Sequence, residues 1–455
     1  MENNFLRLGT AGLRGVIGRA LNPQVIVDYI SALGTYLDGG SVVVGCDTRE
    51  SSPLLKYSVV SALLACGCDV IDAEIAPAPL MHFMVKHYGL AGGVLIGAGH
   101  HQAGWNAVTP LNCEGAYFNS IQTESLLAIY HSRLYRKVSH DQIGRIDTAD
   151  KSRIAAYLKK IVGGLNVEAI KRAEFKVVID FCNGSGCILA ETFSNILGLN
   201  IIPINKELSG FLPHDPEPRP RTGRQVKALI APLGAHVGFV LNSDASRVSV
   251  VTNQCETPSE EFSYAVVADH VLAKSTSQTV LVANICSSRM LDDIVNKFGA
   301  SIEKTSVGQA FIVDRMLETN AKLAGDGSGS VAFDNGINGY DGFMIIGNIL
   351  EAIAETGASS SDLLRRLPNY HIIKRSIPCH SFAYRMLVEL KKFFNDADAH
   401  DETDGLRFDW HYGWVHLRVS DTEPILRVIA EAKERDVAEE LVSRASAFVE
   451  RHDLL

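Results

Sequence analysis

The chain has 455 residues, of which 46% are hydrophobic and 21% are charged, and its formal net charge is −9. A single hydrophobic core rarely grows beyond about 250–300 residues, so this length predicts three or four domains. The acidic balance, with 43 Lys and Arg against 52 Asp and Glu, argues against a nucleic-acid partner but leaves room for a local arginine cluster that binds a small anion.

The nine cysteines are widely scattered and form no Cys-x-x-Cys pair. This pattern is typical of buried, reduced thiols and not of a disulfide framework or a zinc site. The first residues show no signal peptide, and no uncharged apolar run approaches the ~18 residues that a membrane span needs. We therefore expect a soluble, cytoplasmic protein with no membrane partner.

Short β-branched runs alternate along the chain with helix-length amphipathic stretches. Strand signals at 41–47, 175–180 and 279–285 are each followed by a polar turn and a helical pattern, which predicts three α/β domains of related topology, built from βαβ units with mixed sheets. The C-terminal part carries two amphipathic helices, at 383–394 and 436–450, around a Trp-containing strand, which is typical of an α+β domain. The predicted domains are 1–150, 151–255, 256–370 and 371–455, with the Pro-rich run 213–220 as a loop inside the second.

A glycine-rich segment near the N-terminus, 9–15 (GTAGLRG), offers a backbone that a ligand can approach closely. Arg14 would supply a forked donor for a phosphate, and Thr10 lies in the same loop. Taken alone, the segment could also be a tight surface turn. It is followed by 45–49 (GCDTR) and by Ser-Ser-Pro at 51–53.

Five segments in a fixed order resemble the motifs of the α-D-phosphohexomutases, the phosphoglucomutase/phosphomannomutase superfamily. They are 9–15, 97–106, 242–247, 325–330 and 418–427. With the pattern that connects them, the resemblance covers essentially the whole chain. It implies four domains around a central cleft, a phosphoserine, a Mg²⁺ ion and a phosphosugar ligand.

The second segment, 97–102 (GAGHHQ), departs from the family at its most important position. His100 and Asn106 match family residues, and this register places the catalytic serine at Gly99. A glycine has no oxygen that could accept a phosphoryl group, so the family's covalent relay cannot run through residue 99.

The third segment, 242–247 (NSDASR), resembles the family's metal loop but keeps a carboxylate only at Asp244. Asn242 and Ser246 stand where the family has further acidic ligands. Because Mg²⁺ is a hard cation that needs charged oxygen ligands, the sequence predicts that no Mg²⁺ or other cofactor is held tightly here.

The fourth and fifth segments are better preserved. In 325–330 (GDGSGS), Asp326 and Ser328 match sugar-binding positions, although Ser330 replaces a histidine and the segment could be a simple turn. In the fifth, guanidinium groups and hydroxyls suit a dianionic phosphate, while Asp421 is a departure and a structural turn held by an Arg–Glu pair is the alternative. The predicted phosphate ligands are Arg418, Ser420, Thr422 and Arg427.

These residues support two main interpretations. The first is a pseudoenzyme that binds a phosphosugar or phosphate without turning it over. The alternative is an active intramolecular phosphotransferase on hexose phosphates with an altered nucleophile, for which His101 is a candidate. A structural role as the partner of an intact mutase subunit, or a homodimer, is also open.

Overall fold

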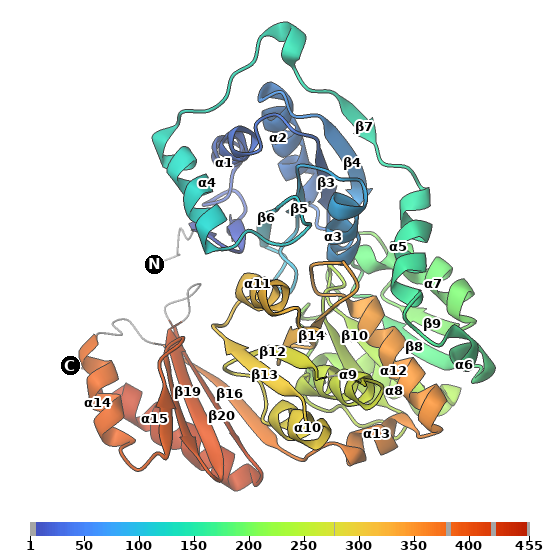
Figure 1. Ribbon diagram of the computed structural model, residues 1–455, viewed down its shortest axis with the longest axis vertical. Coiled ribbons are helices and arrows are strands. Elements are labelled where there is room, and N and C mark those ends of the chain that lie inside the picture. The colour runs from blue at the N-terminus through green and yellow to red at the C-terminus, as the bar shows by residue number, and fades with distance from the viewer. Residues whose placement is uncertain (1–5, 277, 379–383, 420–424, 453–455) are drawn as a thin grey trace.

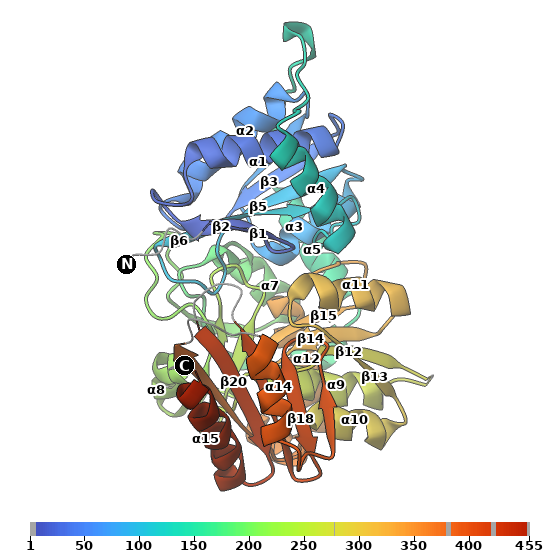
Figure 2. The ribbon, with the colours of Figure 1, turned by 90° about the vertical axis from the view of Figure 1, so that its left-hand side faces the viewer.

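The computed structural model describes residues 6–276, 278–378, 384–419 and 425–452. Four β-sheets, one for each successive part of the chain, are arranged around a common centre (Figure 1). The first part lies at one end of the molecule, and the second, third and fourth parts lie together at the other (Figure 2).

The first sheet has seven strands in the order β1-β2-β6-β5-β3-β4-β7. Its centre is β3 flanked by the parallel strands β4 and β5, and β6 runs antiparallel to β5. A hairpin, β1-β2, extends the β6 side, and β7 extends the β4 side. The strands are β1 Leu6–Gly9, β2 Gly12–Val16, β3 Val42–Cys46, β4 Val70–Ile75, β5 Gly92–Ile96, β6 Trp105–Leu111 and β7 Ile146–Thr148.

The second and third sheets repeat the four-strand core of the first. In each, a central strand lies between two parallel neighbours, and the fourth strand runs antiparallel at one edge. The second sheet consists of β8 Lys176–Asp180, β9 Asn200–Ile204, β10 Val237–Leu241 and β11 Val248–Thr252; the third consists of β12 Val280–Asn284, β13 Ser301–Thr305, β14 Leu323–Asp326 and β15 Ser330–Phe333. The prediction of three related α/β domains is confirmed.

The fourth sheet is entirely antiparallel, in the order β16-β20-β19-β18-β17. Its strands are β16 His371–Pro378, β17 Ala399–Asp401, β18 Leu406–Trp410, β19 Gly413–Val419 and β20 Ile425–Ala432, with helices α14 Tyr384–Phe393 and α15 Arg435–His452. This is the predicted α+β domain.

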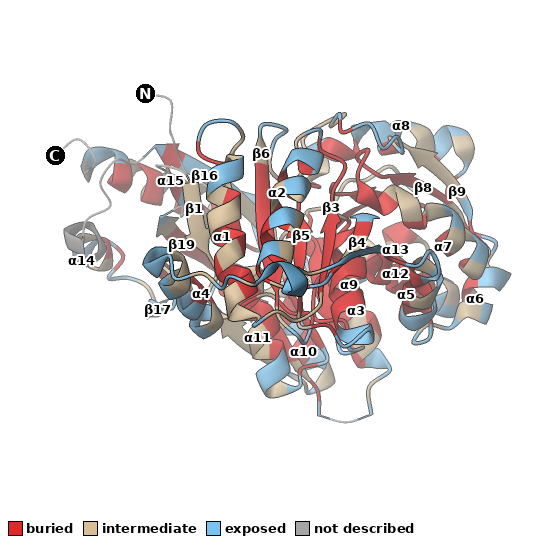
Figure 3. Ribbon diagram, turned by 90° about the horizontal axis from the view of Figure 1, so that it is seen from above, coloured by how far each residue is buried: buried red, intermediate tan, exposed pale blue. Residues whose placement is uncertain are grey.

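Helices cover the three mixed sheets, whose strands are largely buried (Figure 3). One hydrophobic cluster joins residues of the first three domains, from Val43 to Leu367, so these domains share packed apolar surface. The helices are α1 Pro23–Tyr36, α2 Ser52–Ala65, α3 Ala78–His87, α4 Ser120–Ser132, α5 Ser152–Val162, α6 Val167–Arg172, α7 Ala190–Leu197, α8 Arg224–Leu233, α9 Glu261–Ala273, α10 Met290–Phe298, α11 Gln309–Thr319, α12 Gly342–Thr356 and α13 Ser360–Arg366, with single 3₁₀ turns η1 His140–Gln142, η2 Ser185–Leu189 and η3 Pro220–Gly223.

In open α/β sheets, loops that follow the carboxyl ends of parallel strands gather at one edge and form the usual ligand site. Here β5 leads into the segment 97–102, β10 into 242–247 and β14 into 326–329. The topology therefore directs three of the five predicted segments towards the centre of the molecule.

Two further expectations concern the whole chain. Among the described residues, no helix combines the length and apolar character needed to cross a bilayer. The eight cysteines in the described part form no disulfide, but Cys113 is exposed, so the expectation that all thiols are buried is wrong at that position.

Candidate active site

A cavity of about 520 Å³ lies where the four domains meet. It receives residues from four of the five segments that the sequence singles out, and those of the fifth are its first and last residues. Those residues are His100, His101, Gln102 and Trp105 from the first domain; Arg247 from the second; Asp326, Gly327 and Ser328 from the third; and Arg418 and Arg427 from the fourth. The cavity thus brings together side chains that are more than 300 positions apart in the chain.

The loop after β5 is held in place by one buried arginine. Arg49 donates from its guanidinium to the carbonyl oxygens of Gly99, His101 and Gln102. Its own position is fixed by Asp47, whose Oδ2 lies 3.0 Å from the Arg49 Nε. The segment 45–49, which followed the first motif in the sequence, therefore serves to fix the backbone of the second.

Gly99 has a backbone conformation that favours glycine. Its φ is +53°, in the left-handed region. A Cβ built at this position would lie 2.7 Å from the Asp244 Oδ2, so the carboxylate of the predicted metal loop approaches the space that a serine side chain would enter. A serine here would have to displace the tip of Asp244.

The predicted metal ligands hydrogen-bond to one another. The Ser246 hydroxyl donates to Asp244 Oδ1 at 2.6 Å, and the Asn242 Nδ2 donates to the Ser246 Oγ at 3.1 Å. The Asn242 Oδ1 accepts from the backbone N–H of Arg247 at 3.0 Å, which leaves the amide nitrogen of Asn242 facing the loop's interior. An amide nitrogen is not a ligand for Mg²⁺, so this donor set, with a single carboxylate, does not fit the ion.

Both neighbouring histidines are held in the neutral state. Loss of hydration, followed by the charge of Arg14, lowers the pKa of His101 to about 3. Loss of hydration and the charge of Arg247 lower the pKa of His100 well below its usual value, and Arg427 from the fourth domain contributes to the same shift. The two rings lie against each other with their centroids 4.4 Å apart, and His101 also packs against Trp105 at 5.3 Å.

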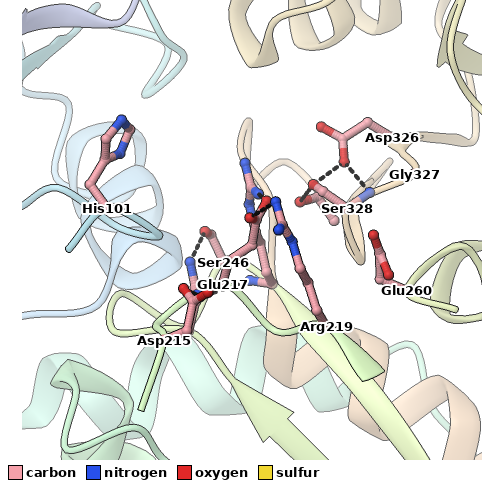
Figure 4. Close-up of polar contacts among 12 residues, drawn as sticks. His101, Asp215, Glu217, Arg219, Ser246, Glu260, Asp326, Gly327 and Ser328 are labelled. Carbon is pink, nitrogen blue, oxygen red and sulfur yellow. Dashed lines mark hydrogen bonds and ion pairs between the residues drawn. The ribbon is translucent and has the colours of Figure 1, made fainter. Parts of the chain in front are cut away.

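Across the cavity, the sugar-loop residues form a compact polar turn, and Figure 4 shows His101 on the opposite side of the space from Asp326 and Ser328. The Asp326 Oδ1 accepts hydrogen bonds from the backbone N–H and the hydroxyl of Ser328. Ser330, which stands in place of a histidine, is buried and lies 3.1 Å from the Ser328 Oγ. The Asp326 carboxylate keeps accepting capacity for ligand hydroxyls.

The two arginines of the fifth segment sit on adjacent strands. Arg418 on β19 and Arg427 on β20 are directly paired in the sheet, so their side chains leave the same face. The Arg418 Nε forms an ion pair with Asp404 at 2.8 Å. Within the described part of the chain, the Arg427 guanidinium forms no ion pair, although it lines the cavity. Ser420 and Thr422 lie outside the described residues.

Thr10 and Arg14 belong to the hairpin β1-β2, which pairs with β6 in the first sheet. Thr10 is in the turn, and Arg14 is paired with Ala107 of β6. Neither residue is in the cavity wall as the described residues form it, and neither is Asp244. Arg14 nevertheless lies close enough for its charge to depress the pKa of His101.

The sequence analysis did not predict a charged cluster in the cavity wall that is formed by Lys374, Glu260 and Glu261. Lys374 of β16 reaches across to the third domain, where its Nζ lies 2.9 Å from Glu260, 3.4 Å from Glu261 and 3.0 Å from the carbonyl oxygen of Gly327. Burial raises the pKa of Glu261 to about 7. Nothing local in the sequence marks Lys374, because its partners lie in another domain.

The Pro-rich run was also undervalued as a plain loop. It contributes Asp215, Glu217 and Arg219 to the cavity wall, and Glu217 lies 3.4 Å from the guanidinium of Arg247. Charged residues that alternate with prolines were the signal that could have identified it, since prolines hold such side chains on a stiff, extended backbone.

Comparisons with known proteins agree with this architecture. The phosphoglucomutase/phosphomannomutase family descriptions match alpha/beta/alpha domain I at 6–137, domain II at 155–255, domain III at 260–370 and the C-terminal domain at 380–447. The chain belongs to the phosphoglucomutase/phosphomannomutase family.

Individual relatives match over nearly their full length. A phosphoglucomutase/phosphomannomutase from Thermococcus kodakarensis is 30% identical over 97% of this chain and 98% of its own. A probable phosphoglucosamine mutase from Thermococcus gammatolerans is 31% identical over 97% of both chains. The crystal structure of a putative phosphomannomutase from Thermus thermophilus has the same fold, with a TM-score of 0.84, 22% identity and coverage of 98% of this chain and 99% of that one. Proteins named as mutases match the chain throughout, and these comparisons give the pseudoenzyme prediction no support.

Proposed function

We propose that this protein is an intramolecular phosphotransferase of the phosphohexomutase type, acting on a hexose phosphate with a nucleophile other than residue 99. The observation that carries the proposal is one cavity whose wall holds Arg247, Arg418 and Arg427, the polar groups of Asp326 and Ser328, and His101. Kinship to mutases over nearly the whole chain supports the reaction class.

The ligand is inferred from the chemistry of the wall. Arg427, with no ion-pair partner among the described residues, is suited to a phosphate dianion, since charge-assisted hydrogen bonds contribute about 1.5–3 kcal/mol each. Asp326 and Ser328 would receive the sugar hydroxyls. The wall carries the positive charge that a phosphosugar needs, and no nucleic-acid or membrane ligand is proposed. We also infer that the reaction proceeds without tightly bound Mg²⁺, because the donor set at Asp244 does not fit that ion.

The test is turnover of glucose 1-phosphate, mannose 1-phosphate and glucosamine 1-phosphate, each with a hexose 1,6-bisphosphate as activator, with and without Mg²⁺. Conversion of at least one substrate to the 6-phosphate in the presence of a chelator is the expected result. Absence of conversion under every condition would overturn the proposal.

The second candidate is a phosphosugar-binding protein without turnover. It is favoured by Gly99 and by the hydrogen bond between Asn242 and Ser246, which occupies the predicted metal ligands. It predicts binding of the same three sugar phosphates, measured by calorimetry, without conversion. If the protein has no turnover, we further propose that it acts as the partner of an intact mutase subunit or forms a homodimer.

A further inference from the structure

A phosphoryl carrier in this cavity must meet three conditions, and the inference that follows rests on the proposed function. The carrier needs an unprotonated nucleophilic atom, it must face the same space as the phosphate-binding and sugar-binding groups, and it must be held rigidly. Phosphoryl transfer also requires nearby positive charge to stabilise the equatorial oxygens.

The hydroxyls near Gly99 do not meet these conditions. The Ser243 hydroxyl is fully buried and donates to the carbonyl oxygen of Gly99 at 2.7 Å. The Ser246 hydroxyl donates to Asp244. A hydroxyl must also lose its proton to attack, which the family's metal would assist and this donor set does not.

The thiol in the cavity wall is also unsuited. The Cys286 Sγ lies 3.1 Å from the Nδ1 of His416, whose Nε2 lies 2.6 Å from the carbonyl oxygen of Asp404. Burial raises the pKa of the Cys286 thiol to about 12, so the thiolate is not populated at neutral pH.

His101 meets all three conditions. Its Nδ1 lies 3.1 Å from the carbonyl oxygen of Ala98, and because a carbonyl oxygen can only accept, the Nδ1 carries the proton. The Nε2 therefore holds the lone pair, and the ring lines the cavity. The hydrogen bond from Arg49 to the His101 carbonyl oxygen and the contact with Trp105 hold the residue in place.

The surroundings of His101 supply the charge that transfer requires. Loss of hydration first, and then the charges of Arg14, Arg247 and Arg49, lower the pKa of His101 and keep the imidazole neutral. Of these cations, Arg247 lines the same cavity as the His101 ring, so its charge would attract the phosphoryl oxygens. A neutral imidazole attacks through a lone pair that it already has, so the loss of a metal that activates a hydroxyl does not prevent its chemistry.

We propose that the Nε2 of His101 carries the phosphoryl group as a phosphohistidine. The lone pair of the Nε2 attacks the phosphorus of a hexose 1,6-bisphosphate, an N–P bond forms, and the P–O bond to the sugar breaks. The sugar oxygen leaves with the electron pair and takes one proton from solvent. In the second half-reaction, a hydroxyl of a hexose monophosphate attacks the phosphorus, releases its proton to solvent and frees the Nε2, so the cycle balances.

The experiment labels the protein with glucose 1,6-bisphosphate that carries ³²P and identifies the bond by its stability. A phosphohistidine is lost in acid and survives alkali, an acyl phosphate on Asp244 is lost in hydroxylamine and alkali, and a phosphoserine survives acid. The expected result is an acid-labile, alkali-stable label on the peptide that contains His101. An acid-stable or alkali-labile label would overturn the inference.

The informative variant is His101→Asn, because the asparagine amide is polar and close to imidazole in size but offers no nucleophilic nitrogen. A structural role would survive this change, whereas a nucleophilic role would not. We expect label and turnover to fall at least ~100-fold while the affinity for glucose 1-phosphate stays the same. His131→Asn, on the exposed end of α4, is the matched control and keeps both label and turnover.

Two outcomes separate the inference from the proposed function. Turnover by the unmodified protein that persists in His101→Asn, or a label that disappears instead in His100→Asn, would overturn the assignment of His101 and leave the proposed function standing. No turnover and no label in the unmodified protein would overturn both.

Discussion

The cavity has two unlike sides. On the side of the third and fourth domains, Asp326, Ser328, Arg418 and Arg427 are the residues predicted to bind a phosphosugar, and all four line the cavity. On the side of the first and second domains, Gly99 carries no nucleophile, and the loop around Asp244 is closed by its own hydrogen bonds. Under the proposed function, the first side recognises the ligand, while the second side must transfer the phosphoryl group without a serine at residue 99.

The rebuilt side is nevertheless well ordered. Asp47 and Arg49 still fix the backbone of 99–102, and Arg14 and Arg247 still place positive charge beside it. A loop with no remaining use would not be expected to keep a buried arginine with three carbonyl partners. This argues for altered chemistry on that side, and the comparison between the sides can be tested by perturbing each in turn.

The largest effect on ligand affinity is expected on the recognition side. Arg427→Ala should lower the affinity for glucose 1-phosphate by about 10- to 100-fold, since a charge-assisted hydrogen bond contributes roughly 1.5–3 kcal/mol. His101→Ala should change this affinity much less, because phosphate recognition depends on the guanidinium charge. Calorimetry measures both, with Arg435→Ala on the exposed surface of α15 as the control. Equal losses in the two cavity variants would contradict the division between the sides.

A pH effect of intermediate size should come from Glu261, whose pKa burial raises to about 7. The folded protein binds the carboxyl proton of Glu261 more tightly than the unfolded chain does. Glu261 therefore favours folding least at high pH, where that proton is lost. Its contribution to stability therefore falls as pH rises from about 4.5, the ordinary glutamate value, to about 7, by on the order of 1–3 kcal/mol. Glu261→Gln should flatten the dependence of the unfolding free energy on pH over this window.

The neighbouring Glu260 provides the control for that measurement. Burial acts to raise the pKa of Glu260. The charge of Lys374 and its hydrogen bond to Glu260 outweigh that effect, so the pKa is lowered. The stability that it contributes is present above its unfolded pKa and is lost as pH falls, so Glu260→Gln should change the slope with the opposite sign. Denaturant unfolding from pH 3 to pH 8 covers both windows, below about 4.5 for Glu260 and from about 4.5 to about 7 for Glu261, and slopes of the same sign would show that the assignment of Glu261 is wrong.

The fold could be predicted from the sequence to a large extent, because local patterns determine it. The strand signals at 175–180 and 279–285 lie within one residue of the bounds of β8 Lys176–Asp180 and β12 Val280–Asn284. The charged cluster around Lys374 could not be predicted, because its contacts join two domains through residues more than 100 positions apart. The left-handed backbone of Gly99 and its approach to Asp244 were likewise invisible, since they depend on how two loops meet.

A smaller effect is expected from restoring the serine. Gly99→Ser places a side chain on a left-handed backbone, at a cost of roughly 1 kcal/mol, and pushes the Asp244 carboxylate from its present position. It should lower the thermal midpoint by a few degrees and should not raise turnover, since Asn242 and Ser246 are unchanged. Differential scanning calorimetry and the assay with glucose 1-phosphate check this. A serine variant with more activity than the unmodified protein would mean that residue 99 alone was limiting.

The smallest effect is expected from magnesium. Addition of millimolar Mg²⁺ to the unmodified protein should leave its thermal midpoint unchanged, because the amide of Asn242 and the hydroxyl of Ser246 provide no charge to replace the ion's water ligands. The variant Asn242→Asp with Ser246→Asp should behave differently. Its three carboxylates repel one another without the ion, which lowers stability, and binding should restore it by about 2.7 kcal/mol at a concentration 100 times the Kd. A chelator must reverse the gain, and adding Gly99→Ser to this variant should be the first combination in which Mg²⁺ raises turnover. Stabilisation of the unmodified protein by Mg²⁺ would contradict this prediction. It would mean that the hydrogen bonds among Asn242, Asp244 and Ser246 break to admit the ion, and that the two sides of the cavity differ less than their residues indicate.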